Sequence, residues 1–344
     1  VLSGLVMKSS DENILSLKLD SGYNIGIHKK NIKKIKEVKT KKEEKKTKKE
    51  EFEYNPNLKT VMILHTGGTI ASKVSYQTGA VYPNFSPSDL LAMFPELRNI
   101  ANIKSKLIAN IFSEDIRFRH YNIIAKEIEK EIKNVDGIIV THGTDTIAYT
   151  ACAMAFILEN LNKPVILVGA QRSSDRPSSD AAMNLLCAAS FIAKTDFGDV
   201  AICMHSKSGD EYCDILPACK TKKLHTSRRD AFKVVNGNLI ARVSKEGKTE
   251  LLQTYKRNIS GNLTLRLFKD SIKVGILKSH PNLAADEVRA FGKLNGLIIE
   301  GTGLGHLGIN KTDLTTKENE AVFNELRKLT KKIPVIMVSQ CIFG

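Results

Sequence analysis

Short apolar runs alternate with longer amphipathic segments over most of the chain. Runs rich in β-branched residues predict buried parallel strands, whereas apolar residues three and four positions apart predict helices. Ile123, Ile124, Ile128 and Ile132 have the helical spacing. The predicted strands are 61–64, 137–140, 165–168, 200–204, 274–277, 297–299 and 334–338, and further helices are predicted at 145–160, 181–193 and 317–329. Strands that alternate with helices predict an α/β fold with a mostly parallel, doubly wound sheet.

The first residues follow a different pattern, which is typical of antiparallel strands. Residues 16–27 alternate apolar and polar side chains around Asp20-Ser21-Gly22, and this arrangement predicts a β-hairpin. Leu5-Val6-Met7 adds one more apolar segment. We therefore expect a remnant of a small β-barrel, with too few strands to close.

Charged residues dominate the segment that follows the predicted hairpin. Residues 39–53 consist mainly of Lys and Glu, which predicts a solvated linker. The whole chain has a net charge of +15, and residues 1–60 contribute 15 Lys against 9 Asp or Glu. Most of the positive excess is therefore spread over the remaining residues. Such a distribution is compatible with a complex that handles RNA and equally with solubility.

These patterns divide the chain into five segments. We predict a partial β-barrel over 1–36, a charged linker over 37–58, an α/β subdomain over 59–250, a connector over 251–269 and a second α/β subdomain over 270–344. Before the connector, apolar residues on either side of Asn236-Gly237 predict another hairpin. The chain lacks an initiator Met and stops directly after a predicted strand. We therefore expect a fragment of a longer protein, truncated at both ends.

Composition argues against several classes of protein. A chain of 344 residues, 42% of them hydrophobic, suffices for two or three globular units with real cores. No apolar run approaches the roughly 18 residues of a membrane span, so no membrane association is expected. The six cysteines form no CxxC pair and the eight histidines form no HExxH pattern. This spacing argues against a metal site and favours reduced thiols in the cytoplasm.

Polar loops that contain glycine follow two of the predicted strands. One loop is 65–71, with Thr69 after two glycines, and the other is 141–146, which includes Thr144 and Asp145. Because loops at the carboxyl ends of neighbouring parallel strands open into one crevice, these side chains can meet. Alone, the first loop fits a tight turn, a phosphate-binding loop or a nucleophile site, and no Walker lysine follows it. Thr144 and Asp145 also fit a simple helix cap.

The two loops, together with segments 164–172 and 178–185, resemble the motifs of the bacterial-type L-asparaginase family of threonine amidohydrolases. The four motifs occur in order, and the resemblance extends over 60–344. It implies an asparaginase-like fold of two α/β subdomains. It also implies that Thr69 attacks a side-chain amide, forms an acyl-enzyme and releases ammonia.

The resemblance implies that Thr144, Asp145 and a lysine support this nucleophile. Counting back from the Asp-Ala-Phe run at 230–232 gives Lys223, with Lys220 and Lys222 as rivals. A threonine hydroxyl needs a base to take its proton, and a neutral Lys223 acting through the Thr144 hydroxyl is a candidate. Burial favours a neutral lysine, whereas an adjacent carboxylate favours a charged one. Asp145 is therefore expected chiefly to bind the substrate α-amino group and to orient Lys223.

The remaining candidate residues would bind the substrate. Backbone N–H groups around Gly68, Thr69 and Ala170 are candidates to stabilise the oxyanion. By the resemblance, Ser113-Glu114 would hold the α-carboxylate and the α-amine, and a tyrosine would lie on a lid over the site. Both Tyr76 and Tyr82 qualify as that tyrosine.

Residues 17–27 and the run 225–232 narrow the resemblance to the D subunits of archaeal Glu-tRNA(Gln) amidotransferases, which are ligases of protein biosynthesis. This implies a cytoplasmic glutaminase/asparaginase-like subunit that takes L-glutamine or L-asparagine and needs no cofactor or metal of its own. It would supply ammonia to an E subunit, which uses ATP and Mg to convert Glu-tRNA(Gln) to Gln-tRNA(Gln). A homodimer through the asparaginase-like domain, within a heterotetramer, is also implied.

Two other functions remain open at this point. The first is a free-standing cytosolic L-asparaginase, since one methylene in a substrate pocket is worth only about 1 to 3 kcal/mol and sequence does not separate glutamine from asparagine. The second, more remote alternative is a non-catalytic RNA-binding module that uses the basic linker 39–53.

Overall fold

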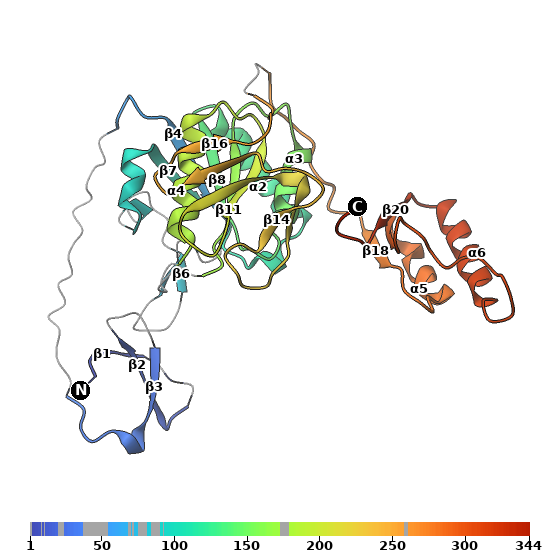
Figure 1. Cartoon of the computed structure of the whole chain (residues 1–344), viewed down its shortest axis with the longest axis horizontal. Coiled ribbons are helices and arrows are strands. Elements are labelled where there is room, and N and C mark those ends of the chain that lie inside the picture. The colour runs from blue at the N-terminus through green and yellow to red at the C-terminus, as the bar shows by residue number, and fades with distance from the viewer. Residues whose placement is uncertain are drawn as a thin grey trace. The chain divides into compact units, whose positions relative to one another are not determined.

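The computed structural model describes residues 2–7, 9, 11–19, 24–36, 54–67, 70, 72–74, 81–83, 90, 91, 93–172, 179–257 and 261–344. The chain divides into two compact units, Val1–Leu267 and Phe268–Gly344 (Figure 1). This division lies inside the segment that sequence assigns to a connector.

The N-terminal segment forms a three-stranded antiparallel sheet in the order β1-β2-β3. Its strands are β1 (Gly4–Met7), β2 (Ile14–Leu19) and β3 (Asn24–His28), followed by a short 3₁₀ helix, η1 (Lys29–Asn31). The β2 and β3 strands pair as the predicted hairpin requires, although its turn, 20–23, lies outside the described residues. Within the described residues this sheet is open, as so few strands require.

An eight-stranded sheet forms the centre of the first unit. Its order is β16 (Thr249–Leu251), β15 (Ala241–Ser244), β12 (Tyr212–Pro217), β11 (Val200–His205), β10 (Val165–Val168), β8 (Gly137–Thr141), β4 (Thr60–His65) and β7 (Asn102–Leu107). The strands from β11 to β7 are parallel, and β12, β15 and β16 continue the sheet antiparallel. The predicted mostly parallel sheet is therefore confirmed.

The central strands are buried on both faces, which explains their continuous apolar runs. Every residue of β4, β8 and β10 is buried. One face packs against α4 (Ala181–Lys194), and α2 (Phe118–Ile132) and α3 (Ile147–Ile157) also pack on the sheet (Figure 1). The strands β7, β12, β15 and β16 have shorter or mixed polar sequences, and sequence patterning did not identify them; β7 and β16 form the two edges of the sheet.

The hairpin predicted around Asn236-Gly237 is wrong. Asn236 does adopt a positive φ of 50°, so a turn forms there. However, β14 (Phe232–Val234) pairs with β13 (Thr221–Lys223), whereas β15 pairs with β12 and β16. The strands on the two sides of the turn, β14 and β15, form their backbone hydrogen bonds with different strands, so the local turn signal does not decide their pairing.

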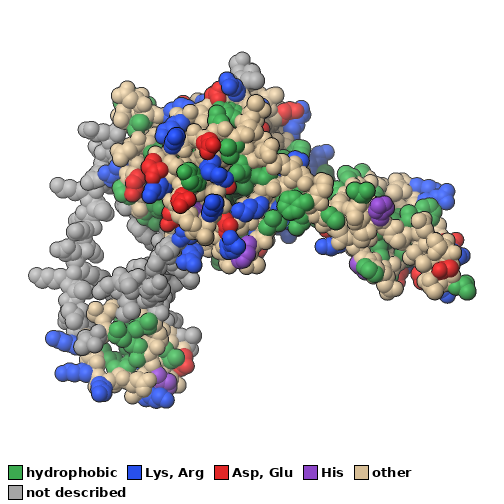
Figure 2. Space-filling model, viewed as in Figure 1, with side chains coloured by type: hydrophobic (Ala, Val, Ile, Leu, Met, Phe, Trp, Pro, Cys, Tyr) green, Lys and Arg blue, Asp and Glu red, His purple; other side chains and the backbone are tan. Residues whose placement is uncertain are grey.

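Shorter elements complete the first unit. They are β5 (Ser72–Val74) paired with β6 (Val81–Pro83), β9 (Leu158–Glu159) paired with β17 (Thr264–Leu265), and the 3₁₀ helices η2 (Pro95–Asn99), η3 (Ser113–Asp115) and η4 (Ala218–Lys220). Charged side chains of both signs are interspersed over the visible face of this unit, rather than gathered by sign (Figure 2).

The second unit is a smaller α/β structure with its own core. Its parallel sheet has the order β18 (Val274–Lys278), β19 (Gly296–Gly301) and β20 (Val335–Ser339). Its helices are α5 (Ala285–Ala290), η5 (Phe291–Lys293) and α6 (Glu318–Thr330). Leu277, Ile299, Val288 and Val322 from these elements share one buried cluster.

No helix in the part of the chain that the structure describes is long and apolar enough to cross a membrane.

Two lysines hold the carboxyl ends of helices against the sheet. The Lys163 ammonium, just before β10, donates to the carbonyl oxygens of Ile132 (3.0 Å) and Val135 (2.7 Å) at the end of α2. Lys59, just before β4, reaches the end of α4 in the same way. A positive charge at this end of a helix satisfies the last carbonyl groups and offsets their partial negative charge.

Lys163→Met is expected to lower the free energy of unfolding by about 1 to 3 kcal/mol, because two part-buried carbonyls lose a charged donor. Urea denaturation followed by far-UV circular dichroism measures the change. The matched control is Lys126→Met, at an exposed position on α2, where a change within about 0.5 kcal/mol is expected. Equal losses in the two variants would contradict this account.

Candidate active site

The loops after β4, β8 and β10 begin at the same level of the sheet. His65 pairs with Thr141, and Thr141 pairs with Val168. Beyond the strands, the Thr66 hydroxyl donates to the Thr141 carbonyl (2.9 Å), and the His142 N–H donates to the Val168 carbonyl (2.9 Å). The parallel register thus brings three loops together at the carboxyl edge, where α/β enzymes place their sites.

The loop after β4 contains the predicted nucleophile. Gly67 has a φ of 114°, and a Cβ there would lie 2.7 Å from the Ile111 nitrogen. Glycine is required at this position, because another residue would be both strained and in collision. Gly68 and Thr69 lie outside the described residues, between Gly67 and the buried Ile70.

Lys223 meets both polar residues of the loop after β8. Its ammonium lies 3.0 Å from Thr144 Oγ1 and 2.7 Å from Asp145 Oδ1. The Lys223 side chain is 15% exposed, whereas the Asp145 side chain is 64% exposed. Asp145 can therefore hold the lysine and still face solvent or a ligand.

The strand that carries Lys223 also distinguishes it from its rivals. Lys223 pairs with Phe232, and both Phe232 and the preceding Ala231 are buried, so the Asp-Ala-Phe run anchors this hairpin. Neighbouring side chains of a strand point to opposite faces. Lys222 is accordingly exposed, and so is Lys220 in η4.

Thr144 and Asp145 do not cap the helix that follows. The N-cap residue of α3 is Thr146, and it makes no side-chain capping bond. Its hydroxyl instead donates to the Ser113 carbonyl (2.6 Å). The side chains of Thr144 and Asp145 are turned to Lys223, so the simple capping interpretation does not describe this loop.

The structure brings Ser113 to the same loop. Ser113 is buried, and a Cβ on Gly143 would lie 2.8 Å from its hydroxyl oxygen, so the close approach requires glycine at 143. Glu114 is exposed. Ala170 is buried just beyond β10.

The two candidate lid tyrosines lie wholly or partly outside the described structure. Tyr82 lies in β6, but its side chain is outside the described structure, and Tyr76 lies outside the described residues altogether.

Gln171 is a further polar residue of this site, and sequence reasoning gave it no role. Its Oε1 accepts a hydrogen bond from the Thr144 hydroxyl (2.9 Å), and its Nε2 donates to the Arg228 carbonyl (2.9 Å). It therefore connects the loop after β8 with the loop that follows Lys223.

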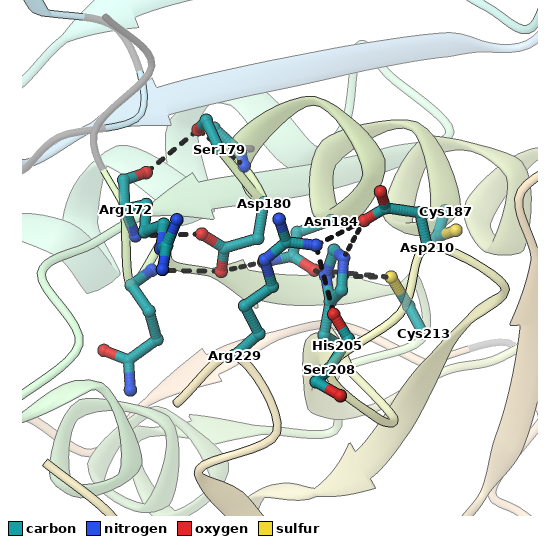
Figure 3. Close-up of polar contacts among 12 residues, drawn as sticks. Arg172, Ser179, Asp180, Asn184, Cys187, His205, Ser208, Asp210, Cys213 and Arg229 are labelled. Atoms are coloured by element: carbon teal, nitrogen blue, oxygen red, sulfur yellow. Dashed lines mark hydrogen bonds and ion pairs between the residues drawn. The ribbon is translucent and has the colours of Figure 1, made fainter. Parts of the chain in front are cut away.

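A buried carboxylate holds the loop that carries Gln171. Asp180, which is fully buried, accepts from the backbone N–H groups of Gln171 (3.0 Å) and Arg172 (2.9 Å) (Figure 3). The Asn184 amide donates to Asp180 (3.2 Å) and to the Gly169 carbonyl (2.9 Å). These bonds fix both ends of the loop after β10.

The same network continues toward the loop after Lys223. Asn184 Oδ1 lies 2.5 Å from Nδ1 of the buried His205, whose Nε2 faces Asp210 at 3.2 Å, and Arg229 pairs with Asp210 (Figure 3). Burial tends to raise the pKa of Asp210, but its bonds to His205 and Arg229 outweigh burial and lower the pKa. Segment 178–185 was recognised as a motif, but nothing in the sequence assigned roles to Asp180, Asn184 or His205.

Two histidines beneath the site are neutral at pH 7. Burial lowers the pKa of His65 to about 3. Burial also lowers the pKa of His142 to about 4, despite the opposing bond to the Gly143 carbonyl. Since that carbonyl can only accept, the proton of His142 lies on Nδ1, and Nε2 accepts from the Thr150 hydroxyl (2.8 Å).

The described residues contain no group of three or more His, Cys, Asp or Glu side chains that could hold a metal ion. All six cysteines are free thiols.

The buried histidines predict that stability decreases in mild acid. Unfolded histidines take up a proton near pH 6.5, whereas His142 stays neutral down to about pH 4 in the folded chain. Stability present above pH 6.5 is therefore lost as the pH falls from 6.5 to 4, by about 3 kcal/mol for His142 alone.

Urea denaturation at pH 7 and pH 5 tests this effect with His142→Gln, whose stability should depend less on pH than that of the unmodified chain. His225→Gln, at an exposed histidine, serves as the control and should retain the original dependence. An unchanged pH dependence in His142→Gln would contradict the assignment.

Comparisons with known proteins agree with the geometry. A family model for the asparaginase N-terminal domain matches residues 60–257, and a model for the GatD N-terminal domain matches residues 1–38. The chain is 43% identical to the D subunit of the glutamyl-tRNA(Gln) amidotransferase from Pyrococcus horikoshii, covering 100% of this chain and 78% of that protein. The corresponding D subunit from Archaeoglobus fulgidus is 40% identical, with the same coverage of both chains.

Solved asparaginases have a similar fold. The thermostable L-asparaginase from Thermococcus kodakarensis superposes with a TM-score of 0.71 at 27% identity, covering 83% of this chain and 81% of that one. A probable cytoplasmic L-asparaginase from Campylobacter jejuni gives a TM-score of 0.64 at 26% identity, covering 83% and 85%. The asparaginase-like architecture expected from the four sequence motifs is therefore confirmed.

Proposed function

The chain belongs to the family of glutamyl-tRNA(Gln) amidotransferase D subunits, and we propose that it hydrolyses the side-chain amide of glutamine, or of asparagine, through a threonine acyl-enzyme. The single observation that carries this proposal is the contact of Lys223 with both Thr144 and Asp145, at the carboxyl edge where the loop of Thr69 begins.

In the proposed reaction, the Thr69 hydroxyl oxygen attacks the amide carbon. Its proton passes through Thr144 to a neutral Lys223, and then to the amide nitrogen, which leaves as ammonia. The acyl-enzyme is next attacked by water, which restores Thr69 and releases the acid. A positioned base is required because a threonine hydroxyl is a weak nucleophile at neutral pH.

The other candidate residues have binding roles in this proposal. Asp145 orients Lys223 and, through its exposed side chain, binds the α-amino group of the substrate. Ser113 and Glu114 hold the α-carboxylate and the α-amine. Gly68, Thr69 and Ala170 supply N–H groups to the oxyanion, and either Tyr76 or Tyr82 covers the site.

We further propose that the released ammonia serves a partner E subunit. That subunit would use ATP and Mg to convert Glu-tRNA(Gln) to Gln-tRNA(Gln), and this chain would form a homodimer within the heterotetramer. The support is the similarity to D subunits over the full length of this chain and the separate match of residues 1–38, a segment that precedes the asparaginase domain.

Substitution of the proposed nucleophile and base should abolish hydrolysis. Thr69→Ala is expected to lower kcat for glutamine hydrolysis by about 10³-fold or more, and Lys223→Met by about 10² to 10⁴-fold. Ammonia release in a coupled assay measures both rates. Lys222→Met and Lys220→Met change exposed lysines on the same segment and should stay within about twofold. Near-normal activity in Thr69→Ala or Lys223→Met would refute the proposed chemistry.

A reconstituted complex tests the proposed partner. Glutamine hydrolysis should rise when the E subunit, ATP, Mg and Glu-tRNA(Gln) are added together, and Gln-tRNA(Gln) should form. Omission of any one of them should remove the increase. Full turnover of asparagine or glutamine without a partner, and no response to one, would instead identify a free-standing asparaginase.

A further inference from the structure

The Thr144 hydroxyl has one hydrogen and two polar neighbours. It accepts from the Lys223 ammonium at 3.0 Å and donates to Gln171 Oε1 at 2.9 Å. When Lys223 is charged it is only a donor, so Thr144 must use its single hydrogen elsewhere. Gln171 supplies the acceptor.

The orientation of the Gln171 amide is fixed by its second contact. The Arg228 carbonyl can only accept, so the amide group that faces it must be Nε2, and Oε1 must face Thr144. Asp180 also holds the Gln171 backbone in place. The side chain therefore cannot satisfy its neighbours if it turns over.

These contacts form a series of hydrogen bonds in which each group accepts from the one before it and donates to the one after it. Lys223 donates to Thr144, Thr144 donates to Gln171, and Gln171 donates to the Arg228 carbonyl. Successive bonds of this kind polarise and strengthen one another. In this arrangement Lys223 is a donor to Thr144, and a charged Lys223 has no lone pair with which to act as a base.

We propose that Gln171 is a positioning residue whose side-chain oxygen competes with the Lys223 nitrogen for the hydrogen of Thr144. A neutral Lys223 has a lone pair and can accept this hydrogen only after it turns away from Gln171. Gln171 thereby holds Lys223 and Thr144 in their resting arrangement. This inference rests on the proposed roles of those two residues in amide hydrolysis.

Two charged groups beside this series of hydrogen bonds are themselves paired. Asp145 contacts Lys223 directly, and the Arg228 guanidinium pairs with Asp230. Among the described residues of the surrounding loops, the other titratable groups are His142, Arg172, Asp180, Lys222, His225 and Arg229, and helix α3 adds Tyr149 and Cys152. None of these is altered in the variants below, so the variants isolate the contribution of residue 171.

Two substitutions of Gln171 should shift the pH profile in opposite directions. Gln171→Met removes the competing acceptor, so the acid limb of kcat/KM for glutamine hydrolysis should move to lower pH. Gln171→Glu keeps an acceptor and adds a negative charge that favours the ammonium, so the acid limb should move to higher pH. Each shift is expected to be about one pH unit.

The control pair uses a glutamine that is remote from Thr144. Gln253 also donates to a backbone carbonyl, that of Asn238. Gln253→Met and Gln253→Glu should leave the acid limb unchanged. If the two Gln171 variants lose activity without opposite shifts, Gln171 has only a structural role and the inference is overturned.

A second measurement does not depend on turnover. The Lys223 side-chain nitrogen can be followed by NMR across a pH titration of the full chain with labelled lysine, with Lys223→Arg used to assign its signal. The titration midpoint should be lowest in Gln171→Met and highest in Gln171→Glu. Identical midpoints would overturn the inference. If the midpoints follow the expected order but the protein does not hydrolyse glutamine, the proposed function is contradicted and the inference about Gln171 stands.

Discussion

The parallel register of β4, β8 and β10 is the constraint on which the site depends. Because His65 lies beside Thr141, and Thr141 beside Val168, three loops far apart in sequence begin at one level. A shift of one residue would turn every side chain of a strand to the other face, where the closely packed core is shaped around different side chains. The register is therefore as rigid as the core, and so is the position of Thr144.

A buried polar network transmits this rigidity to the loops. Asp180, Asn184 and His205 are almost completely buried, and each has a hydrogen-bond partner. At one end the network binds the backbone of Gln171, and at the other end it reaches Arg229 in the loop after Lys223. Buried polar groups without partners are costly, so such a network is stable only when complete. Because hydrogen bonds are directional, the network defines one arrangement of the two loops. Apolar side chains in the same space would not impose a single arrangement.

The groups above this network differ from it in exposure. Asp145 is largely exposed and Lys223 is partly buried, so their ion pair contributes little to stability. Its value lies in orientation, since it holds the lysine within reach of Thr144 and leaves a carboxylate open to a ligand. Beneath them, His65 and His142 are neutral through burial and add no charge to the site.

The sequence by itself determined the α/β class, the buried parallel strands such as β4, β8 and β10, and the identity of the two polar loops, because continuous apolar runs and glycine-bearing loop residues are local signals. It did not determine which strands pair around Asn236-Gly237, because each flanking strand has other partners: β14 pairs with β13, and β15 pairs with β12 and β16. Only the tertiary structure brings Lys223 to Thr144 and gives Gln171 and His205 their contacts. Hydrogen bonds between loops depend on three-dimensional proximity, and the hydrophobic periodicity of a single segment does not indicate which distant loops lie close together.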